Sequence, residues 1–245
     1  MHGIPTAISF DIVRVGKGYG AVFEMVRAKT MRDCLAEASG LDTERELAKL
    51  YADVIRLVGS AEAEFSELPD ARDVFRGYVA KLRDYIPKEE SDRIVQLLDG
   101  MPENRHLLHG DLHLKNIMIS DGEPMLIDMD TLCTGDPVFE LAGLMVAFQF
   151  FSEEDPEDLP RFMGLDREKV REFWGLTCDE VLKDLSEESR ALAMDRIALL
   201  GRIRFLDLVA VKHKGSDEFR EARIAHAQSH LKELLERVDS LAISG

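Results

Sequence analysis

One polar segment near the middle of the chain constrains its fold more than any other feature. The sequence HGDLHLKN occupies residues 109–116, and LIDMD occupies residues 126–130. Short apolar runs flank both clusters, and the Gly- and Pro-containing turn between them is typical of paired strands. Three strand-like pieces therefore bring Asp111, Asn116 and Asp128 to one end of a small sheet. Their oxygen ligands suit a bound Mg²⁺ beside a nucleotide triphosphate, and the same pocket can position a hydroxyl group.

Composition limits the classes of partner. The 245 residues are 45% hydrophobic, enough for one large domain or two small ones with a substantial core. The net charge of −16 argues against nucleic acids and anionic membranes, because both need clustered Lys and Arg. No apolar run approaches the ~18 residues of a membrane span. Three widely spaced cysteines predict neither a disulfide framework nor a zinc site, so we expect reduced thiols and a cytoplasmic location.

Hydrophobic periodicity predicts a short β piece followed by a mostly helical body. Alternating β-branched residues around a Gly-rich turn predict a hairpin over residues 6–26, with a plain turn at 16–20 that lacks the spacing of a phosphate-binding loop. The acidic, Pro-punctuated stretch 152–160 is expected to be a surface loop. The predicted helices span residues 43–59, 71–85, 89–98, 138–151, 167–185, 187–212 and 217–241.

Three blocks carry a resemblance to a known family. The segment HGDLHLKN resembles the HGDxHxxN catalytic loop of the aminoglycoside phosphotransferase and choline kinase-like family. The segment IDMD at 127–130 resembles that family's metal-binding segment, and GDPVFELA at 135–142 resembles its GDPxxDLA block. Because order and spacing agree across all three blocks, the match is far more specific than a single motif. The resemblance extends from Phe10 to about His230.

The resemblance implies a fold and a function. The fold is α+β and protein-kinase-like: residues 1–29 are a remnant of the small N-terminal lobe and the hinge, and residues 30–245 are a helical C-terminal lobe with a small embedded sheet. The implied function is ATP- and Mg²⁺-dependent transfer of the γ-phosphate to a hydroxyl of a small-molecule acceptor. The alternative is a non-catalytic nucleotide-binding or regulatory module on a kinase-like scaffold.

The resemblance also implies residue roles. Asp111 is the catalytic carboxylate that accepts or orients the acceptor hydroxyl, and Asn116 and Asp128 are the metal ligands. The backbone of the hinge meets the adenine. Supporting roles fall to residues that brace the loops. The hinge residues are Glu24, Met25 and Val26, and the supporting residues are His109, His113, Asp130 and Asp136, the last as a helix N-cap or loop anchor.

Several side chains keep two interpretations. His113 either contacts a phosphate or shapes the loop, and the loop role is favoured. Asp130 is equally a second metal ligand or the partner of an arginine. Lys115 stands where the family usually has a small residue, and an exposed lysine is favoured over a phosphate contact. Glu140 replaces the family's usual Asp and keeps its charge.

The C-terminal helices show no distinctive acceptor signature. Arg202, Arg204 and Lys212 are expected to form a solvated helix face, because the apolar positions between them fit a core. The acidic balance gives a weak preference for a cationic acceptor. Relatives use aminoglycosides, choline, sugars, homoserine and macrolides, and the sequence does not choose among them.

The front of the chain departs from the family pattern. Relatives carry three more strands, a helix and a phosphate-binding Lys ahead of the position of Phe10, whereas nine residues precede it here and none is Lys. The chain either starts inside a longer product or is truly short. We expect this chain alone to transfer phosphate poorly. A lone hairpin leaves a free edge, so it must pack on the helical body or associate with another chain, including a second copy.

Overall fold

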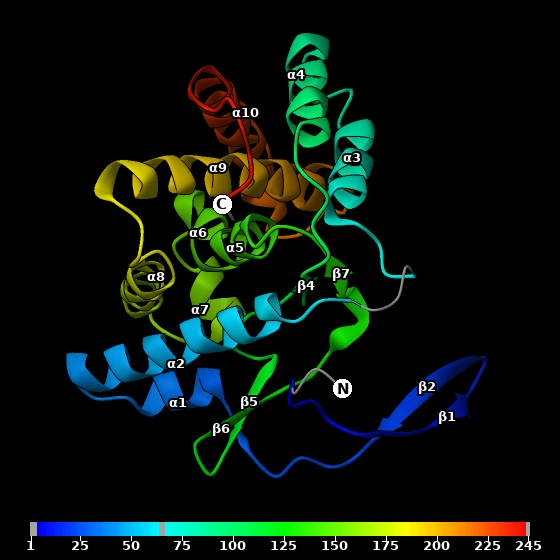
Figure 1. Cartoon of the computed structure of the whole chain (residues 1–245), viewed down its shortest axis with the longest axis vertical. Coiled ribbons are helices and arrows are strands. Elements are labelled where there is room, and N and C mark those ends of the chain that lie inside the picture. Colours follow the sequence, from blue (N-terminus) through cyan, green and yellow to red (C-terminus); the bar gives the residue numbers. More distant parts are fainter. Residues whose placement is uncertain (1–3, 64–66, 244–245) are drawn as a thin grey trace.

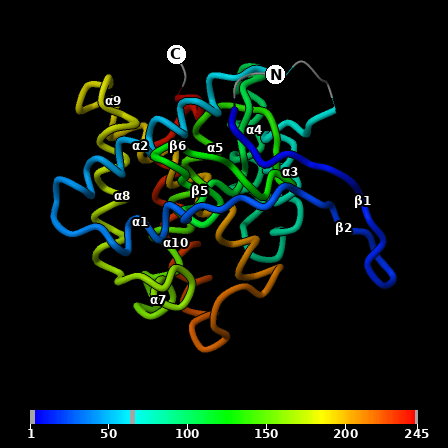
Figure 2. The backbone as a smooth tube through the Cα atoms, turned by 90° about the horizontal axis from the view of Figure 1, so that it is seen from below, coloured from blue at the N-terminus to red at the C-terminus, as the bar shows by residue number. Residues whose placement is uncertain are grey.

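The N-terminal hairpin projects from the rest of the molecule. A computed structural model describes residues 4–63 and 67–243. Strand β1 (Ser9–Val15) pairs antiparallel with β2 (Gly18–Phe23), and a two-residue turn joins them as predicted. Both views show this hairpin extending away from the helices (Figures 1 and 2). Its apolar side chains are exposed, including Phe10 at 66% and Ile12 at 70%, so it does not pack on the helical body.

Two small sheets hold the polar segments in place. Strands β3 (Lys29–Thr30), β5 (Ile117–Ser120) and β6 (Glu123–Leu126) form an antiparallel sheet in the order β3-β5-β6. Strand β4 (Leu107–Leu108) pairs with β7 (Cys133–Thr134). The polar loop after β4 leads into β5, and the end of β6 leads back toward β7. The two sheets therefore bring both ends of the segment from 109 to 132 together.

Helices make up most of the remaining chain. Helix α1 begins with a capping box in which Thr30 and Asp33 exchange hydrogen bonds, and Asp166 caps α8 through two backbone amides. The predicted positions agree closely, although the helices predicted over 71–85, 167–185 and 217–241 each end four residues earlier than predicted. The helices are α1 (Met31–Glu37), α2 (Leu41–Ser60), α3 (Ala71–Lys81), α4 (Lys88–Asp99), α5 (Val138–Met145), α6 (Phe151–Glu154), α7 (Asp158–Met163), α8 (Arg167–Val181), α9 (Glu187–Leu206) and α10 (Arg220–Arg237).

Helix α5 lies at the centre of the helical body. Seven of its eight residues are buried, including Glu140, and it packs along α9. Helix α9 in turn packs against α10, and α2 packs against α8 (Figure 1). Single π-helical segments, 146–150 and 207–211, follow α5 and α9. Such π-bulges are frequent near functional sites, and both lie beside the cavity described below.

The stretch from 152 to 160 is not the surface loop that the sequence predicts. Helix α6 continues through Glu154, and α7 begins at Asp158. Ser152 and Asp155 are buried, and Asp155 is paired with Arg161. The acidic residues suggested solvent exposure, but long-range and local cation partners allow them to lie inside the fold.

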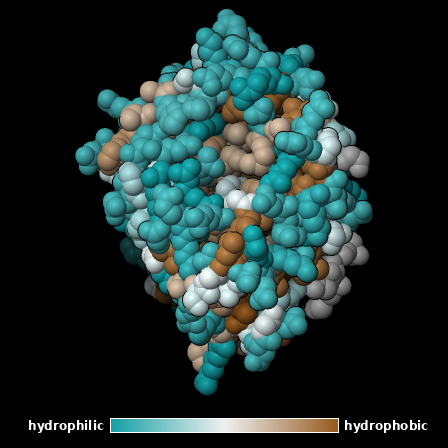
Figure 3. Space-filling view, turned by 90° about the vertical axis from the view of Figure 1, so that its left-hand side faces the viewer, coloured by the Kyte–Doolittle hydropathy of each residue, from teal (hydrophilic) through white to brown (hydrophobic). Residues whose placement is uncertain are grey.

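The surface and the thiols agree with the composition. The face on the side of α8 is mostly hydrophilic, with hydrophobic side chains showing in a central band (Figure 3). All three cysteines are free, and burial raises the pKa of Cys133 and of Cys178 to about 12. Among the described residues, no helix is long and apolar enough to cross a membrane.

Candidate active site

Two hydrogen bonds join the loop after β4 to the end of β6. The His109 ring donates from Nε2 to the Ile127 carbonyl at 3.0 Å, and the Ile127 amide donates to the Asn116 carbonyl at 3.0 Å. His109 is fully buried, and its Nδ1 accepts from the Asp111 amide at 3.3 Å. This tautomer leaves His109 no ring atom for chemistry. It braces the loop, as predicted.

Asn116 and Asp111 are held by the loop's own backbone. The Asn116 side chain is buried and donates from Nδ2 to the Asp111 carbonyl at 2.8 Å. The Asp111 carbonyl also accepts from the His113 amide at 2.9 Å. The Asp111 carboxylate itself stays 42% exposed. The backbone is thus fixed while the carboxylate remains accessible to a ligand.

Asp128 follows β6 in an unusual conformation. Its φ of 62° and ψ of 55° are left-handed, a region that Asp tolerates better than most side chains. Its pKa is raised, first by partial desolvation, then by Asp130 and Asp111. Asp130 lies close enough to Asp128 to contribute to this raised pKa, which leaves its role as a second ligand open. Carboxylates that converge in this way favour a divalent cation.

Glu140 on α5 anchors the start of the loop from 109 to 116. Its Oε2 accepts from the His109 amide at 2.6 Å and from the Gly110 amide at 3.0 Å. Gly110 has a φ of +81°, and a Cβ there would lie 2.5 Å from the Thr131 carbonyl oxygen, so only glycine fits. The loop is therefore fixed on one side by a buried carboxylate and on the other by a close backbone contact.

Removing the Glu140 carboxylate is expected to destabilise the protein. In Glu140→Ala two buried amides lose a charged acceptor, and we expect the free energy of unfolding to fall by about 2–4 kcal/mol. Chemical denaturation measures the change. Glu172→Ala, an exposed change within α8, is the control and should stay within about 0.5 kcal/mol. Equal stability of the two variants would contradict this anchoring role.

Two further residues that the sequence did not identify hold the loop. The Tyr51 hydroxyl on α2 donates to the Leu112 carbonyl at 2.6 Å, and burial raises the pKa of this phenol. Arg204 on α9 donates from Nη1 to the Gly110 carbonyl at 2.9 Å, and its Nη2 lies 3.7 Å from Asp111 Oδ1. Arg204 is therefore a neighbour of the Asp111 carboxylate.

The prediction of a solvated face on α9 is wrong. Besides Arg204, Arg202 is buried, forms two hydrogen bonds with Glu153 and lies 3.6 Å above the Phe150 ring. Lys212 lies 3.2 Å from the buried carboxylate of Asp207. The partners of Arg202 and Arg204 are brought close only by the tertiary fold, which periodicity does not reveal, whereas Lys212 is partly exposed and pairs with a residue five positions earlier.

His113 and Lys115 face α7. Burial lowers the pKa of His113, so its ring is neutral near pH 7. The ring packs edge-on against Phe162, and its Nδ1 is buried without a partner in the described part of the chain. Lys115 donates to the Phe162 carbonyl, and its ammonium lies 4.6 Å from the Phe162 ring centroid. Lys115 is thus not a free surface lysine but a contact that ties the loop to α7.

Asp136 acts as the predicted loop anchor. Its Oδ1 accepts from the Val138 amide at 2.9 Å, in the first turn of α5, and from the Ile243 amide at 3.3 Å. Asp136 is buried. It therefore connects the start of α5 to the C-terminal segment. Asp136 does not line either of the two cavities described next.

Cavities open on both sides of the carboxylates. One, of about 280 Å³, is lined by Asp128 and Met129, by Phe23 at the end of β2, and by Glu24 and Val26 of the predicted hinge. The other, of about 490 Å³, contains Asp111 and His113 and is walled mainly by apolar side chains. Its further lining includes Val146, Ala147, Phe151, Asp158, Leu159, Phe162, Arg204, Leu208 and Lys214.

The hinge positions are only partly available. Glu24 is bound at both ends, because its amide donates to the Ile8 carbonyl and its Oε1 accepts from the Ile8 amide, both at 2.9 Å. Met25 is exposed and lies outside the cavity lining, whereas Val26 lines it. Lys29, just after the hinge, is bound to Glu37.

Comparisons with known proteins agree with the family resemblance found in the sequence. The model of the phosphotransferase enzyme family matches residues 1–173. A search of curated proteins found no match. Similar solved structures include a thermostable mutant of aminoglycoside phosphotransferase APH(4)-Ia in its apo form, at TM-score 0.54 and 18% identity over 95% of this chain and 78% of that one.

Two other structures share the fold at lower identity. Amicoumacin kinase hAmiN, in complex with AMP-PNP, Ca²⁺ and Ami, is similar at TM-score 0.54 and 16% identity, covering 99% of this chain and 75% of that one. A choline/ethanolamine kinase family protein from Mesorhizobium loti is similar at TM-score 0.52 and 13% identity, covering 96% and 74%. The protein-kinase-like fold predicted from the sequence is confirmed.

Proposed function

This chain belongs to the phosphotransferase enzyme family, and on that premise we propose that it binds ATP with Mg²⁺ and phosphorylates a hydroxyl of a small molecule. The observation that carries the proposal is the junction of two cavities at two carboxylates. Asp111 lines one cavity and Asp128 lines the other, while His109 and Asn116 tie their segments together. A nucleotide on one side and an acceptor on the other would meet at this junction.

The carboxylates would divide the chemistry. Asp111, accessible and backbone-fixed, would accept a hydrogen bond from the acceptor hydroxyl and orient it for attack on the γ-phosphate. Asn116 and Asp128, with Asp130 beside them, are oxygen ligands that fit Mg²⁺. Bound Mg²⁺ would neutralise phosphate charge. Arg204 lies 3.7 Å from Asp111 and would help to orient this carboxylate.

The cavity beside the hinge would hold the nucleotide. ADP and hygromycin B are bound in a solved complex of the aminoglycoside phosphotransferase named above. Here, none of the described residues that line the cavity is lysine or arginine. The negative charge of the nucleotide phosphates would therefore have to be balanced by Mg²⁺ held at Asn116 and Asp128. Nucleotide binding would then depend strongly on Mg²⁺. Adenine contacts would come from hinge backbone other than the Glu24 amide, which is already used.

The cavity beside Asp111 would hold the acceptor. Its apolar walls from 146 to 162 suit a hydrophobic face of the acceptor, and Lys214 and Arg204 add positive charge. Asp158, the other acidic residue in the lining, is paired with the buried Arg223. The cavity itself thus offers little free negative charge. It gives no support to the weak preference for a cationic acceptor that net charge suggested.

A non-catalytic nucleotide-binding module remains the second candidate, because the nucleotide cavity lacks a basic residue in its described lining. A screen for ADP release distinguishes the two. The chain is incubated with ATP, Mg²⁺ and representative amino alcohols, sugars, aminoglycosides and macrolides, and any product is identified by ³¹P NMR. A phosphate monoester supports the enzyme. Nucleotide binding without a product in any class favours the module.

We propose that the exposed hairpin associates with a second copy of the chain. Phe10 and Ile12 on β1 are both more than half exposed, and an exposed apolar hairpin of this kind promotes strand pairing. Light scattering after gel filtration is expected to show a concentration-dependent mass above one chain. A Phe10→Ser/Ile12→Ser variant should be monomeric, whereas Leu41→Ser, at a half-exposed apolar site on α2, should not change the mass. A monomeric parent would refute this proposal.

Two further interpretations stay proposals. The division into a small lobe and hinge at 1–29 and a helical lobe at 30–245 is supported by the separate position of the hairpin (Figure 1). A cytoplasmic location is supported by the three free thiols. Limited proteolysis tests the division, and a boundary near residue 29 that resists cleavage would count against it. A fluorescent fusion tests the location, and export of the fusion would count against a cytoplasmic location.

A further inference from the structure

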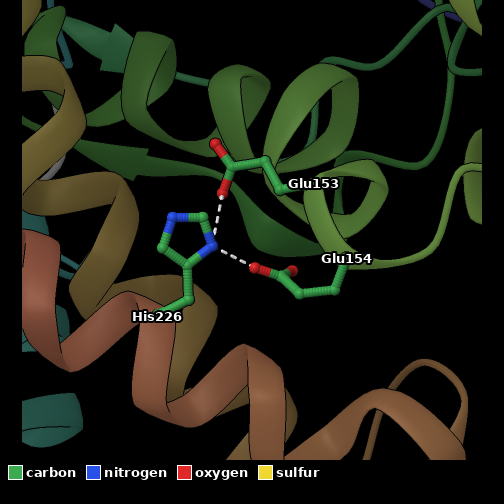
Figure 4. A group of neighbouring side chains, drawn as sticks. All are labelled: Glu153, Glu154 and His226. Carbon is green, nitrogen blue, oxygen red and sulfur yellow. Dashed lines mark hydrogen bonds and ion pairs between the residues drawn. The ribbon is translucent and has the colours of Figure 1, made fainter.

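A second group of metal-ligand side chains lies between α6 and α10, away from Asp111 and Asp128. Glu153 and Glu154 end α6, and His226 faces them from α10 (Figure 4). The His226 Nδ1 donates to Glu154 and lies 3.8 Å from Glu153 Oε2. One ligand atom from each of the three residues lies within 4.8 Å of the other two. Figure 4 shows both carboxylates directed at the same ring nitrogen.

A buried oxygen in this group has no partner. The Glu154 side chain is only 10% exposed, and its Oε2 is buried with no hydrogen-bond partner among residues 4–63 and 67–243. Leaving a carboxylate oxygen buried and unpaired is costly, and a cation bound to that oxygen removes the cost. The unpaired oxygen is an observation separate from the spacing of the three side chains, and it too indicates a bound cation.

A second imidazole stands beside the first. His230 follows His226 by four residues, so both project from one face of α10, and their ring centroids are 4.4 Å apart. Two imidazoles at this spacing, together with carboxylates, form a mixed nitrogen and oxygen donor set. Zn²⁺ and related transition ions prefer such a set, whereas Mg²⁺ and Ca²⁺ prefer oxygen alone.

The surroundings balance the charge of such an ion. Arg202 binds Glu153 through two hydrogen bonds of 2.6 and 2.9 Å and is held over the Phe150 ring. It fixes the orientation of the Glu153 carboxylate as an outer-shell group does for a metal ligand. Arg202 thus offsets the charge of one of the two carboxylates and leaves the other available to balance the charge of a bound cation.

We propose that Glu153, Glu154 and His226, with His230 as a fourth donor, bind one Zn²⁺-type ion that links α6 to α10. The ion would take the place of the proton between His226 Nδ1 and Glu154, and the ring would bind it as the neutral tautomer that carries its one proton on Nε2. Since Phe151 at the start of α6 lines the cavity beside Asp111, the link would also fix that wall. The proposal is independent of the proposed phosphotransfer.

Cobalt provides a direct test. Chelator-treated protein is titrated with Co²⁺ and then with Zn²⁺ in excess Mg²⁺, which occupies the oxygen ligands near Asp128. We expect one equivalent of Co²⁺ with visible absorption bands, displacement by Zn²⁺, and a higher melting temperature with Zn²⁺. His226→Ala and Glu154→Gln should each weaken binding by at least about tenfold. Circular dichroism verifies that both variants are folded.

The control is another histidine beside a glutamate. His106 lies 3.8 Å from Glu62, but that pair has no third ligand within reach in the described structure. His106→Ala should bind Co²⁺ as the parent does. The proposal is overturned if the parent binds less than one equivalent, if His226→Ala binds as tightly as the parent, or if His106→Ala loses binding to the same extent.

Discussion

Asp111→Asn is expected to reduce phosphate transfer by about 10²–10⁴-fold, the usual contribution of a positioned general base. Asn keeps the shape of the side chain but does not accept a proton. The loop should remain folded, because Asp111 holds it through its backbone carbonyl and amide, which the change leaves in place. Initial rates of ADP release, with the acceptor that the screen identifies, measure the loss.

The control separates catalysis from general effects of charge. Asp121→Asn removes the same charge on the exposed turn between β5 and β6 and should leave the rate within about twofold. Nucleotide affinity of Asp111→Asn should change little, because Asp111 lines the other cavity. If Asp111→Asn retained the parental rate, another group would have to orient the hydroxyl, and the assignment of Asp111 would be wrong.

Asp128→Asn is expected to abolish the Mg²⁺-dependent part of nucleotide binding. A hard divalent ion binds far more weakly to an amide than to a carboxylate, and the cavity has no basic residue in its described lining to compensate. Asn is the right substitute because it tolerates the left-handed backbone at this position, whereas Ala would add strain. The variant therefore tests charge and coordination without disturbing the turn.

Calorimetric titration with AMP-PNP, with and without Mg²⁺, measures this effect. The parent should lose most of its affinity when Mg²⁺ is omitted, and Asp128→Asn should bind equally weakly in both conditions. Asp121→Asn is again the matched control, since Asp121 also has a positive φ, of 52°. An unchanged Mg²⁺ dependence in Asp128→Asn would show that the metal is held elsewhere.

The sequence predicted those parts of the site that local pattern determines. The loop from 109 to 116, the return to Asp128 and the hairpin turn all depend on short-range spacing, and the structure has them where expected. His109 forms hydrogen bonds within and beyond its loop, which is consistent with the bracing role proposed from the sequence. The order and spacing of the three motif blocks also predicted the fold class.

The parts that the sequence missed depend on distant partners. Arg202 and Glu153 are 49 residues apart, and Arg204 and Gly110 are 94 apart, so neither pair leaves a periodic signal. Charged residues were taken as solvated because they usually are. For the same reason, the acidic stretch 152–160 was predicted to be a surface loop. Tyr51 lies within the amphipathic helix predicted over 43–59. Nothing in that pattern distinguishes a tyrosine that hydrogen-bonds to a loop from one that only packs in the core.

The most direct test of the account is the coordination of Mn²⁺, a paramagnetic substitute for Mg²⁺, in the presence of AMP-PNP. The account predicts that electron paramagnetic resonance of the parent shows one bound Mn²⁺ with hyperfine coupling to nucleotide phosphorus. Asp128→Asn should lose this signal, and Asp121→Asn should keep it. Phosphorus-coupled Mn²⁺ of equal intensity in Asp128→Asn, or Mn²⁺ bound at Asp128 without phosphorus coupling, would contradict a phosphotransfer centre at these carboxylates.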